Sequence, residues 1–251
     1  MAGLYFAEHG AGPPLLLIHG LMATGEMFEP VIEHFSARHR VIVPDLRGHG
    51  KSRALPPPYD VSHLASDLAA LLDQLGTGPA AILGYSQGGA IAQQLVLEHP
   101  ECCSRLVLAC TYAFNMATLR ERLEGHLAPV LIRVLGMRRF ANLVVRQGAK
   151  GLGRKRGDWL AAMIASQDRS LMLAAWTETM MFDSRLRLGE IKCPTLVIAG
   201  SNDDAVPIHH ARMLHTGIAG SRLVVIVDAD HSLIWTHPDD FMRAADEFLD
   251  A

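Results

Sequence analysis

The stretch Ala80-Ala81-Ile82-Leu83-Gly84-Tyr85-Ser86-Gln87-Gly88-Gly89 decides the fold. An apolar strand pattern comes first and a helical pattern through Ile91 and Leu95 follows, which predicts a sharp turn at Ser86. Glycine is needed there because larger side chains would crowd the turn. The helix that begins at Gln87 points its free N–H groups toward the serine and favours developing negative charge. Ser86 is therefore a candidate nucleophile; the alternative is an ordinary glycine-rich β–α turn.

A serine hydroxyl is a weak nucleophile until a base takes its proton. The candidate base is His231, which closely follows the last predicted strand and so lies at the carboxyl end of the sheet. Other histidines lie in helical or helix-edge stretches, and we expect them to face solvent: His99, His209, His210 and His215.

The carboxylate that orients this base should follow the preceding strand, where two acids are adjacent. We favour Asp203, because Asp204 would then face the next helix as an acid of its first turn. The opposite assignment stays open. An earlier strand ends in Ala109-Cys110-Thr111-Tyr112, without a carboxylate, and this removes the main rival position.

Short apolar runs alternate with helical patterns, which predicts an α/β fold: a mostly parallel sheet with helices on both faces. The clearest helix runs from Val61 to Leu75 behind an Asp60 cap, and the last runs from Pro238 to Leu249. The predicted strands are Leu15–Ile18, Val41–Val43, Ala80–Leu83, Leu106–Ala109, Thr195–Ala199 and Leu223–Val227.

The alternation stops between Thr111 and about Leu188, where the sequence predicts helices without a strand, interrupted from Gly148 to Gly157. A helical insertion between two strands predicts a lid over the carboxyl edge of the sheet, where ligands bind in open α/β sheets. We therefore expect residues 1–111 and 188–251 to form the core and residues 112–187 to form the lid.

Composition excludes several classes of protein. The formal net charge of −3 gives no indication of a nucleic-acid partner. Residues 1–9 do not resemble a signal peptide, and the longest apolar runs are too short to span a membrane. The four cysteines lack CxxC spacing, which predicts reduced thiols instead of disulfides or a structural zinc site. We expect a cytoplasmic protein without a metal or an organic cofactor. The cysteines are Cys102, Cys103, Cys110 and Cys193.

The order Ser86, Asp203, His231 resembles that of the α/β-hydrolase superfamily, whose triads follow the order Ser, Asp, His. Pro14-Leu15-Leu16-Leu17-Ile18-His19-Gly20 is similar to the oxyanion strand of that family, and Asp45-Leu46-Arg47-Gly48-His49-Gly50-Lys51-Ser52 is similar to its D-x-R-G-x-G-x-S loop. The resemblance covers the chain from about residue 4 to its end, except for the insertion. It is specific for the superfamily and poorly specific for the substrate.

The resemblance implies an oxyanion hole made by the backbone N–H groups of Leu21 and Gln87, and a bracing role for His19. A serine at the turn argues against haloalkane dehalogenases and epoxide hydrolases, which use aspartate there. Two positions depart from the family. Asp230 stands where glycine is frequent and would favour a protonated His231 unless it points away. Leu21-Met22 lacks the glycine run of lipases and the aromatic residue of haloperoxidases.

The insertion is rich in large, flexible apolar side chains, which could line an acyl pocket or simply pack the helices together. The candidate substrate contacts are Met22, Tyr85, Trp176 and Met180. The insertion also has no acid from Gly125 to Gly157. The basic residues there indicate a solvated face or an entrance for an anionic substrate or an acidic acyl-carrier protein. They are Arg133, Arg138, Arg139, Arg146, Lys150, Arg154, Lys155 and Arg156.

These features predict a carboxylesterase-like serine hydrolase that cleaves small-molecule esters of small to medium acyl chains through an acyl-enzyme. The same triad could serve a thioesterase, an esterase of carrier-bound acyl chains, an enol-lactonase or a hydrolase of carbon–carbon bonds. A protein of another class, a non-catalytic receptor for small molecules, could also keep this fold.

Overall fold

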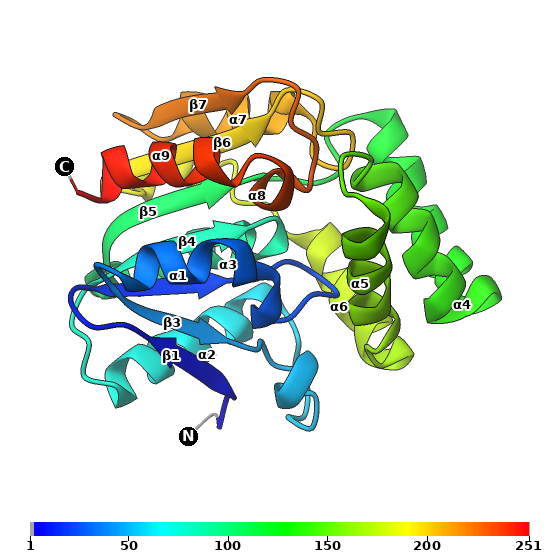
Figure 1. Ribbon diagram of the computed structural model, residues 1–251, viewed down its shortest axis with the longest axis horizontal. Helices are drawn as coiled ribbons and strands as arrows, with labels where there is room; N and C mark the ends of the chain where they lie inside the picture. Colours follow the sequence, from blue (N-terminus) through cyan, green and yellow to red (C-terminus); the bar gives the residue numbers. More distant parts are fainter. Residues whose placement is uncertain (1–2, 251) are drawn as a thin grey trace.

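The computed structural model describes residues 3–250 and contains one seven-stranded sheet in the order β1-β3-β2-β4-β5-β6-β7 (Figure 1). Every neighbouring pair is parallel except β1 and β3, which are antiparallel. This confirms the predicted α/β class. The strands are β1 (Phe6–His9), β2 (Pro14–Ile18), β3 (Arg40–Pro44), β4 (Ala80–Tyr85), β5 (Cys103–Ala109), β6 (Thr195–Gly200) and β7 (Arg222–Ile226).

All six predicted strands are present, and the structure adds β1. This edge strand pairs only with β3 and is mostly half-buried, so it does not need the long apolar run by which the other strands were predicted. At the other edge, β7 ends at Ile226, so the predicted strand was one residue too long at Val227, whose side chain is exposed. Residues 1, 2 and 251, at the ends of the expected core ranges, lie outside the described residues.

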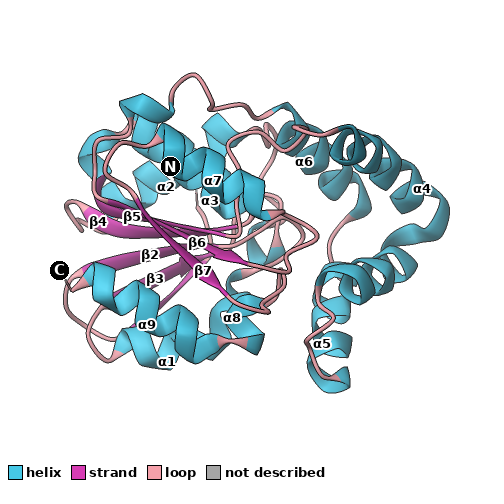
Figure 2. Cartoon of the chain, turned by 90° about the horizontal axis from the view of Figure 1, so that it is seen from above, coloured by secondary structure: helices cyan, strands magenta, loops and turns pink. Residues whose placement is uncertain are grey.

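Two layers of helices cover the sheet, with α2, α3 and α7 on one face and α1, α8 and α9 on the other (Figure 2). The helix predicted behind Asp60 is α2, and the Asp60 carboxylate accepts a hydrogen bond from the His63 N–H at 3.0 Å. These helices are α1 (Glu29–Ser36), α2 (Val61–Gln74), α3 (Gln87–Glu98), α7 (Ile208–Gly217), α8 (Leu233–Thr236) and α9 (Pro238–Leu249). Short 3₁₀ turns are η1 (Gly25–Phe28), η2 (Gly50–Ser52), η3 (Pro100–Cys102) and η4 (Leu188–Glu190).

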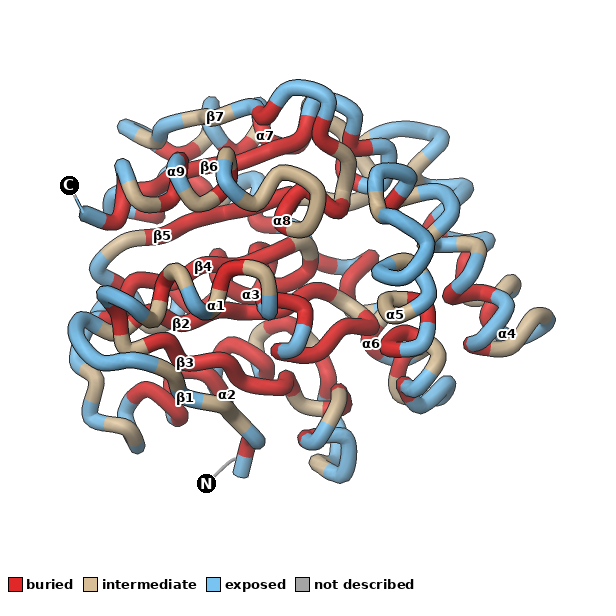
Figure 3. Tube along the Cα trace, in the orientation of Figure 1, coloured by how far each residue is buried: buried red, intermediate tan, exposed pale blue. Residues whose placement is uncertain are grey.

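Burial is concentrated in the central strands, which separate one apolar core on each face of the sheet (Figure 3). Strands β4 and β6 are buried along their whole length, as expected for strands covered on both faces. The rigid centre of the sheet therefore carries the loops that begin at Ser86 and after Gly200.

Three helices occupy the predicted insertion between β5 and β6: α4 (Leu119–Gly148), α5 (Arg154–Ala165) and α6 (Arg169–Met181). They pack on one another beyond the ends toward which the parallel strands point (Figures 1 and 2). Gly136, with φ of 72°, breaks α4 into two helical parts. The expected interruption is shorter than predicted, because α5 already begins at Arg154.

All four cysteines are free, as the sequence predicted; the nearest pair, Cys103 and Cys193, has its sulfurs 3.7 Å apart. Within residues 3–250, no helix combines the length and the apolar character that crossing a membrane requires.

Candidate active site

Ser86 lies on a tight turn between β4 and α3, with φ of 56° and ψ of −122°. Two glycines make this turn possible. A Cβ on Gly84 would lie 2.4 Å from the Gly88 carbonyl oxygen, and a Cβ on Gly88 would lie 2.1 Å from the Ile18 carbonyl oxygen. Any larger residue would collide with backbone, so the turn can form only with glycine at these positions.

A continuous chain of hydrogen bonds joins the three predicted triad residues. His231 Nε2 lies 3.1 Å from Ser86 Oγ, and His231 Nδ1 lies 2.8 Å from Asp203 Oδ2. The other oxygen of Asp203 accepts hydrogen bonds from the backbone N–H groups of Ala205 and Val206. The buried carboxylate is thus held in place, and it can orient an imidazole that points its second nitrogen at the serine.

The charge balance at His231 follows from these contacts. Burial alone would lower the pKa of His231, but the charge and the hydrogen bond of Asp203 outweigh it, and Asp230 adds a smaller effect, so the pKa is raised above 6.5. Asp230 points partly away, since its carboxylate accepts hydrogen bonds from the N–H groups of Ser232 and Gly151. Burial would raise the pKa of Asp230, but hydrogen bonds from the Ser232 hydroxyl and from these two N–H groups lower it.

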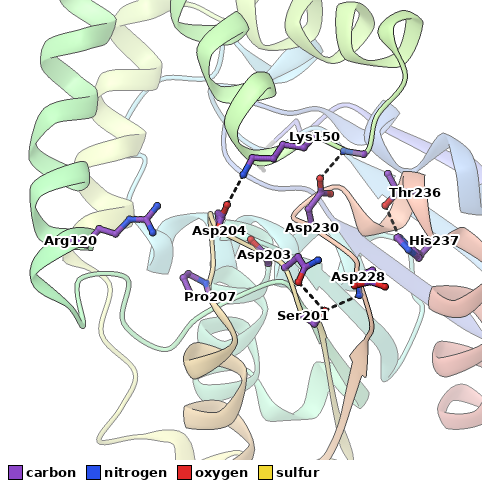
Figure 4. A pocket seen from close by; sticks show the side chains of 12 residues that line it. Arg120, Lys150, Ser201, Asp203, Asp204, Pro207, Asp228, Asp230, Thr236 and His237 are labelled. Carbon is purple, nitrogen blue, oxygen red and sulfur yellow. Dashed lines mark hydrogen bonds and ion pairs between the residues drawn. The ribbon is translucent and has the colours of Figure 1, made fainter.

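Asp204 does not have the role that the sequence suggested. It is exposed, and α7 begins only at Ile208, so Asp204 is not an acid of the first helical turn. Its carboxylate pairs instead with Lys150 Nζ at 2.8 Å (Figure 4). Lys150 and Gly151 belong to the turn between α4 and α5, so this turn contacts the residue next to Asp203 and the residue next to His231.

An open pocket of about 760 Å³ is lined in part by Asp203 and lies between this turn and the loops that follow β6 and β7 (Figure 4). Its lining includes acids from both loops and the basic side chains of Arg120 and Lys150. Ser86 does not line this pocket, which is therefore distinct from the space in front of the serine hydroxyl.

Tyr85 lies beneath His231. Its ring is buried and meets the His231 imidazole edge-on at 5.9 Å, and its hydroxyl donates to the His231 carbonyl oxygen at 2.8 Å. This placement gives Tyr85 a part in positioning His231, and its contact with substrate stays a prediction. In the sequence, the position of Tyr85 next to Ser86 was the one indication that it belongs to the site.

Cys110 is a neighbour of the triad that the sequence did not mark. It follows β5, and its sulfur lies with one atom each of Asp203 and His231 in a group whose members are all within 4.8 Å. Burial and the charge of Asp203 raise the pKa of the Cys110 thiol, which therefore stays protonated. The end of β5 thus packs against the triad even though it carries no acid.

The two N–H groups expected to form an oxyanion hole belong to Leu21, next to a glycine that approaches Ser86, and to Gln87, which directly follows Ser86. No turn or side-chain hydrogen bond within the described residues uses the N–H of Leu21 or of Gln87. The next N–H, that of Met22, points to His49 Nε2 at 3.4 Å, and Met22 has φ of 63°. Leu21 and Gln87 therefore keep free donors near Ser86.

His19 holds the Leu21 turn as expected. Its ring bridges the Gly20 carbonyl oxygen and the Leu46 N–H, at 2.8 and 3.0 Å. Burial lowers the pKa of His19 to about 4 and that of His49 to about 3, so both rings are neutral at pH 7. They support the turn as hydrogen-bonding groups and supply no charge to the site.

The other predicted substrate contacts lie between the core and the insertion. Met22 is buried in an apolar cluster with α4, α5 and α6, and Trp176 packs against the same cluster. Met180 is buried beside Gly125 and Asn115. Next to Met180, Thr179 accepts a hydrogen bond from the Gln87 side chain, so α6 lies directly over the serine turn. Substrate contact by these residues stays a prediction.

One expectation about histidines was wrong. His210 is fully buried, where the sequence predicted a solvent-facing residue, because the first turn of α7 packs under α4 and against Tyr112. The helical pattern places His210 on the side of α7 that faces the protein, and its polar character concealed this. His215 is exposed as expected, and His99 and His209 are half-buried.

The comparisons with known proteins agree with this geometry. A family model described as the alpha/beta hydrolase fold matches residues 13–238. The chain belongs to the α/β hydrolase family. Among the proteins similar to this α/β hydrolase is the magnesium-chelatase 30 kDa subunit of Rhodobacter capsulatus, 38% identical over 218 residues, which cover 79% of this chain and 73% of that protein.

Two further similar proteins are named for hydrolysis. The pimeloyl-[acyl-carrier protein] methyl ester esterase of Chromobacterium violaceum is 30% identical, with 98% of both chains covered. The crystal structure of the enol-lactonase from Burkholderia xenovorans LB400 has a TM-score of 0.91 and 27% identity, and the match covers 99% of this chain and 96% of that one. The expectation of a hydrolase is thus confirmed at the level of the family.

The raised pKa of His231 gives this α/β hydrolase a predictable dependence on pH. A protonated imidazole cannot accept the serine proton, so we expect kcat/KM to fall as the pH drops through the raised pKa, with a midpoint above 6.5. Asp230→Asn removes a charge that raises this pKa and should move the midpoint to lower pH. Asp228→Asn is the control, since Asp228 is an exposed acid of the same loop. Equal midpoints in all three proteins would contradict the electrostatic role of Asp230.

Proposed function

We propose that the protein is a carboxylesterase-like serine hydrolase. Ser86 Oγ attacks the acyl carbon of an ester while His231 Nε2 takes its proton, and Asp203 stabilises the imidazolium that forms. The proton then passes to the departing alkoxide, which leaves as the alcohol. Water attacks the acyl-enzyme with the same base, and the acid is released. The continuous chain from Ser86 Oγ through His231 to Asp203 carries this proposal.

The tetrahedral intermediates of both steps carry a negative oxygen. The unused N–H groups of Leu21 and Gln87 supply two donors for it, each worth about 3 kcal/mol in the transition state. The N-terminus of α3 begins at Gln87 and adds its partial positive charge. No metal ion or organic cofactor has a part in this sequence of steps.

Residues 112–187 act as a lid on a core made of residues 1–111 and 188–251 in this proposal. Contacts of α6 with the serine turn, and of the α4–α5 turn with the acid and base loops, support it. The apolar boundary between Met22, Trp176 and Met180 would receive an acyl chain of small to medium length. The four free thiols favour a reducing compartment, the cytoplasm.

A carrier-bound ester is the second candidate substrate. The eight basic residues between Gly125 and Gly157 are all exposed, and α4 also carries an exposed apolar stripe. An acidic acyl-carrier protein would complement such a surface. One similar protein is named for an ester of this kind. The stripe consists of Leu119, Leu123, Leu127, Val130 and Val134.

A panel of substrates tests these proposals. Acyl length and leaving group should vary independently across p-nitrophenyl esters, methyl esters, acyl thioesters and lactones, with labelling by a fluorophosphonate probe in parallel. We expect labelling at Ser86 and the highest kcat/KM for esters of small to medium acyl chains. A folded protein that neither reacts with the probe nor turns over any member of the panel would instead be a small-molecule receptor.

The carrier arm of the panel has its own readout. If an acyl-carrier ester is the substrate, kcat/KM should fall with rising salt and in the Arg138→Glu/Arg139→Glu double variant, while p-nitrophenyl ester hydrolysis stays constant. Lys192→Glu is the control. Lys192 precedes β6 and so lies at the amino ends of the strands, whereas the insertion lies beyond their carboxyl ends. Independence from both salt and charge reversal would remove the carrier protein as a partner.

A further inference from the structure

Three side chains gather where the start of the insertion meets the core. Glu121 belongs to the first turn of α4, and His209 and His210 belong to the first turn of α7. Both histidines aim Nε2 at the same carboxylate oxygen, Glu121 Oε1, at 2.9 Å from His209 and 3.1 Å from His210. The three atoms all lie within 4.8 Å of one another.

Hydrogen bonds to Thr118 fix the carboxylate of Glu121 independently of the two histidines. Its second oxygen, Oε2, accepts a hydrogen bond from the Thr118 N–H at 2.8 Å, and the Glu121 N–H donates to Thr118 Oγ1. This capping box fixes the direction in which Oε1 points. Hydrogen bonds of this kind orient the ligands of metal sites in proteins.

The histidine nitrogens are not satisfied by the carboxylate alone. His209 Nε2 is buried and has no hydrogen-bond partner within the described part of the chain, although it lies 2.9 Å from Oε1. The distance is short, but the geometry is not that of a hydrogen bond. The His210 side chain is 0% exposed, and only its Nε2 makes a hydrogen bond to Glu121. The buried nitrogen points at a carboxylate oxygen without forming a hydrogen bond to it. A cation bound between the two atoms would be a ligand partner for both.

We propose that Glu121, His209 and His210 bind a divalent transition-metal ion of the zinc class and that this ion joins α4 to α7. Two imidazole nitrogens and one carboxylate oxygen are a donor set that zinc accepts, whereas magnesium and calcium prefer oxygen. Tetrahedral bonds of about 2.0–2.2 Å place ligand atoms roughly 3.3 Å apart. The distances from Glu121 Oε1 to the two Nε2 atoms, 2.9 and 3.1 Å, need to change by only a few tenths of an ångström.

The His209 side chain is 38% exposed although its Nε2 is buried, so the site lies near the surface, and a water molecule would be the fourth ligand. The role of the site is structural: it ties the first turn of the insertion to the core and touches none of Ser86, His231 or Asp203. No spacing motif marks it in the sequence, because Glu121 lies 89 residues from His210 along the chain. The sequence predicts a protein without a metal ion, and the following titration tests that prediction.

The test uses the full chain, first treated with a chelator that is then removed. Calorimetric titration with Zn²⁺ should give one ion per chain, and Zn²⁺ should raise Tm. His209→Ala and Glu121→Gln should each weaken binding about tenfold or more and abolish the rise in Tm. His215→Ala, an exposed histidine of the same helix, should behave like the wild type. Because these readouts do not depend on hydrolysis, they are independent of the proposed function.

Co²⁺ distinguishes this site from the other candidate cluster, Cys110 with Asp203 and His231. We expect visible absorption typical of a four-coordinate cobalt site, without the near-ultraviolet band of a thiolate ligand, and the same spectrum in Cys110→Ser. Equal Zn²⁺ affinity in wild type and His209→Ala would overturn the proposal. So would a thiolate band that disappears with Cys110→Ser, or the absence of any binding in the micromolar range.

Discussion

Replacing Ser86 by alanine is expected to reduce ester hydrolysis by about 10⁴- to 10⁶-fold, measured as kcat under saturating substrate. The Ser86 hydroxyl is hydrogen-bonded to His231 Nε2, and the proposed mechanism makes it the nucleophile. Removing it leaves the oxyanion donors and the binding surface, which account for the activity that remains. The loss of labelling by a fluorophosphonate probe should be complete.

The same substitution should leave the fold almost unchanged. The Ser86 hydroxyl supports no other element, and alanine meets the same backbone strain at φ of 56°. We expect Tm to stay within about 3 °C of the wild type. Ser62→Ala, a change at an exposed hydroxyl on α2 that bonds Glu98, is the matched control and should retain full activity and labelling. Turnover at the wild-type rate in Ser86→Ala would remove the proposed mechanism.

Asp203→Asn should lower kcat by about 10⁴-fold while the protein stays folded. An asparagine oxygen can still accept the N–H groups of Ala205 and Val206. Its NH₂ group would then face His231 Nδ1 and favour the tautomer that carries the proton on Nε2. That nitrogen could no longer take the proton of Ser86, so the geometry would survive without the base.

Asp204→Asn separates the two adjacent acids. Asp204 is exposed and pairs with Lys150, and exposed pairs of this kind contribute about 1 kcal/mol or less. We expect a change in kcat of no more than a few-fold. If Asp204→Asn were the more damaging of the two variants, the assignment of the acid would have to be reversed.

The parts of the site that could be predicted are those set by local pattern. The strand–turn–helix around Ser86 needs glycine at two positions, and the printed sequence has them. Asp203 and His231 each follow a buried strand, so parallel pairing brings both to one edge of the sheet. The geometry of these three residues matches the expectation, and their catalytic roles stay predictions for the variants above.

What could not be predicted depends on contacts between distant segments. The strand β1 is stabilised by pairing with β3 and has no apolar run of its own. The helical pattern places His210 on the inner side of α7, but its contact with Glu121 of α4 joins segments 89 residues apart in the chain. Tyr85 and Cys110 lie beside His231 because the ends of β4 and β5 meet the loop after β7, which is far away in the sequence.

The turn between α4 and α5 contacts the residues next to Asp203 and His231. Lys150 pairs with Asp204, and the Gly151 N–H donates to Asp230. If residues 112–187 act as the proposed lid, an outward movement of this turn has to break both contacts. Opening the lid and loosening the loops that carry Asp203 and His231 would then be thermodynamically linked.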